Sequence, residues 1–268
     1  MESFSQALIS RGFKRTNEPL PPGDRGLVVH GVGGCGKTTL IHQFVIANEW
    51  ARAYTLTTKE TYDDSGRFIR KYQGQALSDG LIHILDEYAQ CDDPTKLPPF
   101  HVLATDPYQA YRCEPLRAHY TNRVSHRVPR NIANSITLLT GFPLESAVPA
   151  TTEGVYTVRP WNEQLKPQIL CEEGEIHRAL AARNCQHKLI HEAIGEEWPI
   201  VTVLFDSTLG PESDRRLRCL YYIAATRATY ELNLRPYLPT RSGGVVKERL
   251  PHTRCRLCSG SGNISPAN

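Results

Sequence analysis

Long apolar runs are missing from this chain of 268 residues. No stretch approaches the roughly 20 consecutive apolar residues that a helix needs to cross a bilayer. The N-terminus also lacks the apolar core of a signal peptide. We therefore expect no direct membrane insertion. Internal repeats and low-complexity tracts are absent as well, and the length suffices for one large domain or two small ones.

A dominant charge of one sign is also missing. Charged residues make up 22% of the chain and the formal net charge is +3, so composition alone does not establish a nucleic-acid partner. Two local runs are more basic than the rest. Residues 112–130 hold five arginines against Glu114, and residues 235–256 hold six cations against Glu248. Such runs suit a phosphate backbone, and a solvated protein face is the alternative for each.

A regular pattern of cysteines is the third absence. The eight cysteines are mostly scattered along the chain, and we expect a reducing, intracellular environment on this basis. Near the end of the chain, His252, Cys255 and Cys258 have metal-ligand spacing. Three potential ligands without a fourth nearby argue against a structural zinc site there.

The most informative feature that is present is a glycine-rich segment, Gly-Val-Gly-Gly-Cys-Gly-Lys-Thr-Thr at residues 31–39. It fits the phosphate-loop pattern G-x-x-x-x-G-K-[ST]. A strand-like run at residues 27–30 precedes it and a helix-like run at residues 40–46 follows it. This order gives an anion a nest of N–H groups and a favourable helix dipole. The expected nucleotide-binding residues are Gly31, Gly33, Gly34, Cys35, Gly36, Lys37, Thr38 and Thr39.

Apolar runs that alternate with helix-length connections predict the fold class. Residues 53–57, 81–85 and 100–104 are further strand candidates after the glycine-rich segment. This alternation is typical of an α/β protein with a mostly parallel sheet. In such sheets, ligands bind beyond the carboxyl ends of the strands. We therefore expect Asp86 and Asp106, which follow two of these strands, beside the phosphate loop.

Polar residues after these strands supply chemistry that a phosphate loop needs. With Thr38 holding Mg²⁺, Asp86 would coordinate the ion through water, and Glu87 would orient and deprotonate the attacking water. Gln109 can hydrogen-bond the γ-phosphate or that water. Adjacent acids are common by chance, and Asp106-Pro107 also fits a plain turn. Their positions after the loop favour the catalytic interpretation.

The second half of the chain predicts another α/β unit. Helices are expected at residues 129–139 and 213–225, and strands at residues 200–205 and 231–234. We place the domains at residues 1–118 and 119–268, and we expect the tail from about residue 240 to be mobile.

Two arginines of this second half are candidate catalytic residues. Arg127 or Arg227, brought across a cleft between the domains, would neutralise charge that develops on the γ-phosphate. A simple surface charge is the alternative for each arginine.

These motifs, in this order, resemble those of superfamily 1 RNA helicases. The resemblance covers about residues 27–234, and its most specific parts are the phosphate loop and the Ala-Thr-Arg segment that ends at Arg227. The compact length, Asp-Pro-Tyr-Gln at residues 106–109 and Ser-His-Arg-Val-Pro at residues 125–129 are similar to one branch. That branch is the first triple-gene-block movement proteins of filamentous plant viruses, of the potexvirus and carlavirus type.

The resemblance implies two RecA-like domains with mostly parallel sheets, which is a P-loop NTPase fold, and ATP or another NTP with Mg²⁺ as cofactors. The implied ATPase residues are Lys37, Thr38, Asp86, Glu87, Gln109, Arg127 and Arg227. The implied RNA-contacting residues are Thr57 and Thr58 in one motif and Gly195, Glu196 and Thr202 in another.

The function that the resemblance implies is that of an NTPase and RNA helicase. It would bind single-stranded RNA and remodel viral RNA for cell-to-cell movement, in the host cytoplasm or at plasmodesmata. Suppression of host RNA silencing is implied as well, as are partnerships with the virion coat protein and small membrane movement proteins.

Two other functions stay open. The first is a nucleotide-gated RNA-binding and assembly protein, which could associate with itself and have little true unwinding; the lack of room for accessory subdomains favours it. The second is a small-molecule phosphotransferase, which leaves Arg227 and the whole second half unexplained.

Overall fold

The computed structural model describes residues 2–23, 26–57, 68–152, 154–160, 164–206 and 209–237. The chain divides into two compact units. Unit 1 comprises Met1–Asn134 and Pro143–Glu153, and unit 2 comprises Ser135–Phe142 and Gly154–Asn268. Within the described residues, no helix has the length and apolar character needed to span a membrane.

Several predictions from the sequence fall outside this description. Thr58, the possible metal-ligand set of His252, Cys255 and Cys258, and the tail from about residue 240 are not among the described residues. They stay predictions.

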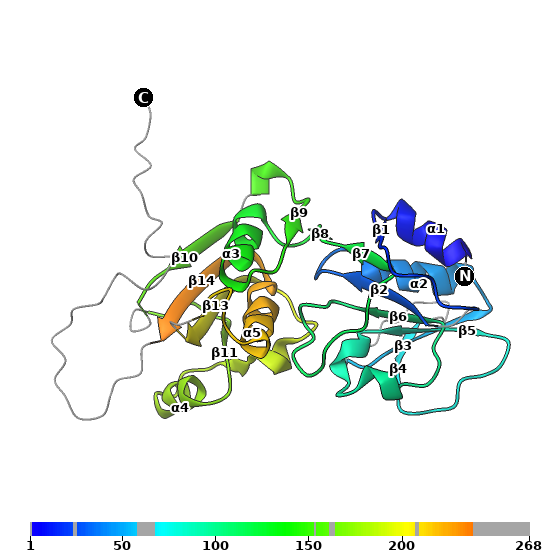
Figure 1. The fold of residues 1–268 in the computed structure, drawn as a ribbon. Helices are drawn as coiled ribbons and strands as arrows, with labels where there is room; N and C mark the ends of the chain where they lie inside the picture. The colour runs from blue at the N-terminus through cyan, green and yellow to red at the C-terminus, as the bar shows by residue number, and fades with distance from the viewer. Residues whose placement is uncertain are drawn as a thin grey trace. The chain divides into compact units, whose positions relative to one another are not determined.

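Unit 1 is built on a seven-stranded sheet with the order β1-β7-β2-β6-β5-β3-β4 (Figure 1). Only the pairing of β1 with β7 is antiparallel. The central strands β2 and β6 are fully buried, as their continuous apolar sequences predict. The strands are β1 (Lys14–Arg15), β2 (Leu27–Gly31), β3 (Ala51–Thr55), β4 (Ile69–Lys71), β5 (Ile82–Asp86), β6 (Val102–Thr105) and β7 (Tyr120–Asn122).

Helices and short turns complete unit 1. Helix α1 (Glu2–Ser10) packs on α2 (Lys37–Ala47) through Phe4 and Phe44, whose rings meet edge to face with centroids 4.9 Å apart. A separate pair of short parallel strands joins two distant parts of the unit. The remaining elements are η1 (Tyr88–Gln90), η2 (Pro94–Lys96), β8 (Val124–Ser125), β9 (Glu145–Ser146) and η3 (Ala150–Thr152).

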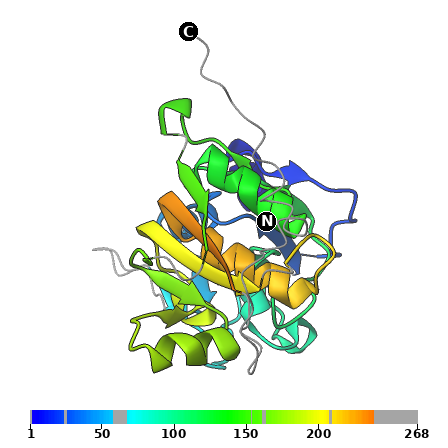
Figure 2. The same cartoon turned by 90° about the vertical axis from the view of Figure 1, so that its left-hand side faces the viewer.

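Unit 2 is built on a five-stranded sheet with the order β10-β14-β13-β11-β12, in which every pairing is parallel. Helices α3 and α5 lie side by side, and Arg218 Nη1 of α5 donates to the Thr140 carbonyl of α3 at 3.0 Å. Helix α4 lies near the β11–β12 edge of the sheet (Figure 2). Helix α3 (Arg130–Thr140) begins in unit 1 and continues in unit 2 from Ser135. The other elements of unit 2 are β10 (Val155–Val158), β11 (Ile169–Cys171), α4 (Glu175–Ala182), β12 (Lys188–Leu189), η4 (Ile190–Ala193), β13 (Trp198–Asp206), α5 (Arg215–Ala225) and β14 (Ala228–Tyr237).

The α/β class with mostly parallel sheets is confirmed, but the chain divides later than residues 118 and 119. Strand β7 pairs with β2 in parallel, from Val29↔Tyr120 to Gly31↔Asn122, and therefore belongs to the sheet of unit 1. The segment after it stays in the same unit as far as Asn134. A strand of three residues gives too short an apolar pattern to be assigned to one sheet from sequence.

Candidate active site

The glycine-rich loop joins β2 to α2, as the sequence predicts. Gly34 and Gly36 have φ angles of +80° and +90°, values that glycine adopts without the steric cost of a side chain. Gly36 is the N-cap of α2 and forms no side-chain cap. The loop thus presents the backbone N–H groups and the positive dipole end of α2 to an anion.

A second segment of unit 1, residues 125–127, packs along this loop. Ser125 Oγ donates to the Gly33 carbonyl at 2.7 Å, and the His126 N–H donates to the Gly34 carbonyl at 3.0 Å. A Cβ atom added at Gly33 would lie 2.8 Å from Arg127 Nη2. The guanidinium of Arg127 therefore lies against the loop from within the same unit. The sequence had placed Arg127 in the second domain, and the late division of the chain corrects this placement.

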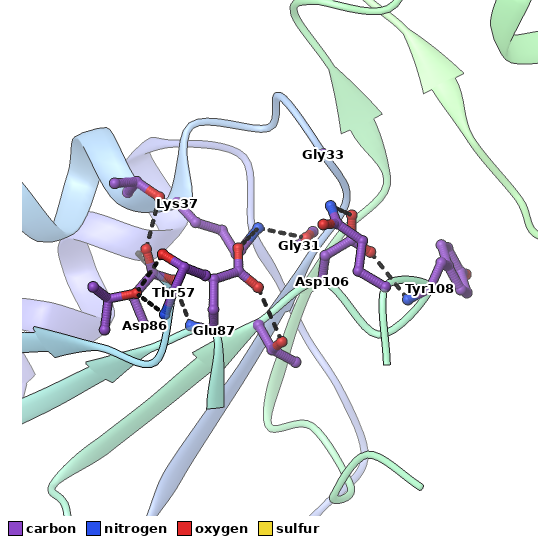
Figure 3. Close-up of polar contacts among 12 residues, drawn as sticks. Gly31, Gly33, Lys37, Thr57, Asp86, Glu87, Asp106 and Tyr108 are labelled. Atoms are coloured by element: carbon purple, nitrogen blue, oxygen red, sulfur yellow. Dashed lines mark hydrogen bonds and ion pairs between the residues drawn. The ribbon is translucent and has the colours of Figure 1, made fainter. Parts of the chain in front are cut away.

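Lys37, the first residue of α2, directs its ammonium group back over the loop (Figure 3). Its side chain is 6% exposed, and Nζ donates to the Gly31 carbonyl at 2.9 Å and lies 3.8 Å from Glu87 Oε1. Burial alone would lower the pKa of Lys37, but the nearby negative groups, Glu87 first, outweigh it and raise the pKa. The group is held as a buried cation beside the loop.

Asp86 ends β5 and contacts the first turn of α2. Thr38 Oγ1 donates to Asp86 Oδ2 at 2.7 Å, and the Glu87 N–H donates to Asp86 Oδ1 at 3.0 Å. Burial and the charge of Glu87 raise the pKa of Asp86 to about 6, although Lys37 and the hydrogen bonds act against the rise. A hydroxyl and a carboxylate held together are the hard oxygen donors that Mg²⁺ prefers.

Glu87 has a backbone conformation that is rare for a residue with a side chain, with a φ angle of +56°. Its Oε2 accepts a hydrogen bond from Thr105 Oγ1 at 3.2 Å, so its carboxylate is held between Thr105 and Lys37. The side chain is 17% exposed. Residues held in such conformations cluster at functional sites, and this carboxylate is both oriented and reachable by water.

Gln109 and Asp106 lie beside Gly33 of the loop. Gln109 Nε2 donates to Asp106 Oδ2 at 2.9 Å, and the Tyr108 N–H donates to Asp106 Oδ1 at 3.0 Å. A Cβ atom added at Gly33 would lie 3.5 Å from Asp106 Oδ2 and from Gln109 Nε2. Burial raises the pKa of Asp106, with the charge of Lys37 acting against the rise. Both side chains therefore lie at the loop, where sequence reasoning expects them.

Unit 1 thus gathers eleven of the predicted residues around one loop, namely Gly31, Gly33, Gly34, Cys35, Gly36, Lys37, Thr38, Asp86, Glu87, Gln109 and Arg127. Thr39 follows Thr38 in α2. Sequence reasoning gave no role to Thr105 and Ser125, which position Glu87 and the loop. Thr105 directly precedes Asp106, and Ser125 begins the Ser-His-Arg-Val-Pro segment.

Thr57 follows the end of β3, close to this site. Thr55 lies opposite Asp86 in the register of β3 and β5, and the Thr57 N–H donates to Thr55 Oγ1 at 3.2 Å. Figure 3 shows Thr57 beside Asp86 and Glu87. Its contact with RNA stays a prediction.

The three residues of unit 2 that were predicted to contact RNA occupy different environments. Gly195 has a φ angle of +87° in a turn, and Glu196 forms a half-exposed ion pair with Lys188 at 2.7 Å. Thr202 is fully buried in β13, where its Oγ1 donates to the Lys166 carbonyl at 2.9 Å. The hydroxyl of Thr202 therefore serves the sheet of unit 2 in this conformation.

Arg227 is 2% exposed and its guanidinium is hydrogen-bonded within unit 2. Nε donates to the Ile223 carbonyl at 3.0 Å, Nη2 donates to Thr226 Oγ1 at 3.1 Å, and Nη1 donates to the Glu196 carbonyl at 3.4 Å. These contacts join the end of α5 to the turn before β13. Any action on a phosphate requires the guanidinium to exchange these acceptors.

Comparison with known proteins identifies the family of this chain. The family model described as the viral superfamily 1 RNA helicase core domain matches residues 27–235. The movement and silencing protein TGBp1 of Lolium latent virus is 61% identical over 258 residues, covering 96% of this chain and 96% of that protein. TGBp1 of Papaya mosaic potexvirus is 34% identical over 260 residues, covering 96% of this chain and 99% of that protein.

The fold is also similar to that of a solved helicase. The arterivirus nonstructural protein 10 (helicase) aligns with a TM-score of 0.54 and 19% sequence identity over 78% of this chain. The alignment covers 59% of the arterivirus chain. At this level of identity the likeness concerns the fold, which is the RecA-like fold of P-loop NTPases. From its phosphate loop, its acidic strand end and these matches, the chain belongs to the viral superfamily 1 RNA helicases, in the TGBp1 branch.

Proposed function

We propose that this protein is a Mg²⁺-dependent NTPase that binds single-stranded RNA and remodels viral RNA for movement between host cells. The observation that carries the proposal is the bond between Thr38 and Asp86 beside the buried ammonium of Lys37. It places an oxygen donor set for Mg²⁺ next to a cation and a nest of N–H groups, which together fit a nucleoside triphosphate.

Each residue of unit 1 has a distinct task in this proposal. A bound Mg²⁺–ATP would supply the phosphoryl group and a Lewis acid. The ammonium of Lys37 would bind the β- and γ-phosphate oxygens, and Thr38, with Asp86 acting through water, would hold the ion. The carboxylate of Glu87 orients a water molecule and takes its proton at Oε1 or Oε2. Gln109 orients the same water or the γ-phosphate through its amide.

Two arginines are assigned to charge neutralisation. Arg127 already lies against Gly33, so it can act on phosphate oxygens without leaving unit 1. Arg227 would have to give up its hydrogen bonds to Ile223, Thr226 and Glu196. A guanidinium that acts only after such an exchange would couple hydrolysis to a conformational change.

The biological part of the proposal rests on the relatives. A protein named movement and silencing protein covers 96% of this chain at 61% identity, which supports roles in cell-to-cell movement and in suppression of RNA silencing. We extend the proposal to a site of action in the host cytoplasm or at plasmodesmata. The coat protein, small membrane movement proteins and other copies of the chain are the proposed protein partners.

The deciding experiment is ATP turnover with and without single-stranded RNA, on the parent and on Lys37→Ala. We expect RNA-stimulated phosphate release by the parent and a loss of roughly 100-fold or more in the variant, because a preorganised charge is removed. RNA retention should be largely kept. Lys96→Ala is the matched control, since Lys96 is a highly exposed lysine of the same unit. Turnover by Lys37→Ala at the parental rate contradicts the proposal.

A second candidate function is nucleotide-gated RNA binding and assembly with little unwinding. The exposed arginines of the first basic run, Arg112, Arg117, Arg123 and Arg130, support it, because they offer cations to RNA phosphates. A tailed-duplex assay separates the two functions. Melting in proportion to protein, without sustained turnover, favours assembly. Hydrolysis that RNA does not stimulate would instead favour a small-molecule phosphotransferase.

A further inference from the structure

Unit 2 contains a cluster of metal-ligating side chains that shares no residue with the phosphate-loop site. Cys171, His177 and His187 each offer one ligand atom, and these atoms all lie within 4.8 Å of one another. Cys171 is fully buried, and both histidines are half-buried. Cys171 forms no disulfide. The thiol is therefore available as a ligand, and the histidines border solvent from which an ion could enter.

Three different elements bring these residues together. Cys171 is the last residue of β11 and pairs with Leu189 in β12. His187 directly precedes β12, which has only two residues, and His177 is in the first turn of α4. The cluster thus lies where a short edge strand and a short helix meet the sheet. A bond shared by all three elements would hold this edge of unit 2 together.

The two imidazoles are already oriented for a shared ligand. His177 Nδ1 and His187 Nε2 lie 2.8 Å apart, and His187 Nδ1 lies 2.7 Å from the Cys185 carbonyl oxygen. When His187 Nδ1–H donates to that carbonyl, Nε2 carries a lone pair toward the cluster, as in many metal-ligating histidines. Two nitrogens on one tetrahedral zinc ion are about 3.3 Å apart, given Zn–N bonds of about 2.0–2.1 Å. A small separation of the rings would therefore admit the ion.

The electrostatic environment of Cys171 also suits a cation. The carboxylates of Glu192 and Glu172 act with their negative charge on the buried thiol. A divalent cation bound there would compensate these charges.

We propose that Cys171, His177 and His187 form a zinc site, with the fourth position open to water. One thiolate and two imidazoles are the donor types that zinc takes in proteins, whereas Mg²⁺ prefers oxygen. The site is separate from the phosphate loop in both its residues and its chemistry. Three protein ligands and an open position are the pattern of a zinc ion that can bind a further ligand. The bound ion would also tie α4 and β12 to β11.

The test measures zinc binding by the full chain under reducing conditions. A background variant, Cys255→Ser with Cys258→Ser, removes the cysteines of the other candidate set, so that only one site is counted. Zinc is titrated in competition with a chromophoric chelator, and Co²⁺ is used as a spectroscopic probe. We expect one equivalent of Zn²⁺ per chain and a thiolate-to-cobalt charge-transfer band in the ultraviolet.

Cys171→Ser and His187→Asn should each lose that equivalent, a larger effect than the 10- to 100-fold loss of affinity that is roughly typical of changes outside the ligand set. Cys91→Ser is the matched control, because Cys91 is a free cysteine of unit 1, and it should bind like the background variant. Zn²⁺ should raise the thermal midpoint of the background variant but not that of Cys171→Ser. Circular dichroism without metal checks that each variant is folded.

Three results would overturn the proposal. They are the absence of a zinc equivalent in the background variant, an equivalent that survives in Cys171→Ser, and a cobalt spectrum without the thiolate band. None of them bears on ATP turnover, so failure of the zinc site is distinguishable from failure of the proposed function.

Discussion

The hydroxyl of Thr38 donates to Asp86 Oδ2 at 2.7 Å, across a separation of 48 residues in the chain. This bond joins the first turn of α2 to the carboxyl end of β5, which are the two elements that the sequence had linked only by the order of its motifs. The pair is preorganised for a divalent ion, because neither side chain has to move far to share one.

The first prediction concerns this pair. Asp86→Asn should lower Mg²⁺ affinity by about 10- to 100-fold and Mg²⁺-dependent turnover with it, as is typical for loss of a group that holds an ion through its bound water. The same change should raise the thermal midpoint without nucleotide. The pKa of Asp86 is raised to about 6 in the folded protein, so its charged form is disfavoured at neutral pH by folding.

Thr38 offers a matched control for that prediction. Thr38→Ser keeps the hydroxyl and should keep turnover, whereas Thr38→Val keeps the shape and should lose it. Magnesium titrations of turnover and differential scanning fluorimetry provide the two readouts. Equal turnover in the serine and valine variants would mean that the hydroxyl does not act on the ion.

Glu87→Gln carries the second prediction. The glutamine keeps the size of the side chain and its hydrogen bond from Thr105, but it cannot take a proton. Turnover should fall roughly 10²- to 10⁴-fold, as is typical for loss of a general base. Nucleotide affinity, measured with a fluorescent analogue, should change far less. Glu114→Gln serves as the control, since Glu114 is an exposed glutamate of the same unit. A parallel loss of affinity would point to a binding role instead.

Much of the fold follows from local patterns. The buried strand expected at residues 200–205 is the central part of β13 (Trp198–Asp206), and the helix expected at residues 213–225 is α5 (Arg215–Ala225). Continuous apolar runs and a helical period of apolar residues carry these elements. Strands of two or three residues, such as β7 and β12, have no such signal, because their positions depend on pairing with distant strands.

The residues of the candidate site also fall into those that a local pattern predicts and those whose positions depend on distant segments. Lys37, Asp86 and Glu87 were predictable because a motif and a strand end fix them locally. The position of Arg127 beside Gly33 depends on bonds between segments about 92 residues apart, as that of Ser125 Oγ to the Gly33 carbonyl shows. Arg235, counted in the second basic run, is 3% exposed in β14 and donates to the Gln164 carbonyl at 3.4 Å. Sequence reasoning could not tell this buried arginine from a surface charge.

The third prediction tests Arg227. Its three hydrogen bonds within unit 2 give it a structural role, so loss of turnover alone cannot identify a catalytic one. Arg227→Lys keeps the charge but not the planar fork. If Arg227 also stabilises the transition state, turnover should fall roughly 10³-fold or more, while nucleotide affinity stays near that of the parent.

Stability supplies the control for this variant. Urea unfolding should show that Arg227→Lys is still folded at the assay temperature, with a midpoint between those of the parent and Arg227→Ala. Turnover near the parental value in a folded Arg227→Lys protein would leave Arg227 with its structural role alone.

A fourth prediction concerns pH and His119. Nδ1 of this buried histidine accepts a hydrogen bond from the Val28 N–H at 2.8 Å, so the ring must be unprotonated at that atom. Burial, with the nearby charge of Arg15, lowers its pKa. Because the unfolded chain binds the proton more readily, stability is complete above the unfolded pKa of about 6.5 and falls as the pH drops below it.

The expected loss is about 1–3 kcal/mol between pH 7.5 and pH 5, the cost of leaving a buried partner unsatisfied. Urea unfolding at the two pH values measures it. His119→Asn keeps an acceptor near the position of Nδ1 but does not titrate, so its pH dependence should be smaller by this amount. His126→Asn, which removes an exposed histidine, should leave the pH dependence unchanged.

The last prediction concerns RNA binding through the first basic run. Four of its arginines are exposed in unit 1, namely Arg112, Arg117, Arg123 and Arg130. If they bind RNA phosphates, affinity for single-stranded RNA falls with salt, and each contact contributes about 0.7 to the slope of log K against log salt concentration. Replacing Arg112 and Arg123 together by glutamine should therefore reduce the slope by about 1.4.

Lys96→Gln is the control for this series, because Lys96 is an 82% exposed cation of the same unit that lies outside the run. It should leave the slope unchanged while altering the net charge by one. Fluorescence anisotropy across a range of salt concentrations gives the slopes. An unchanged slope in the double arginine variant would assign Arg112 and Arg123 to a solvated face, and RNA would then be held by other cations or by neutral contacts.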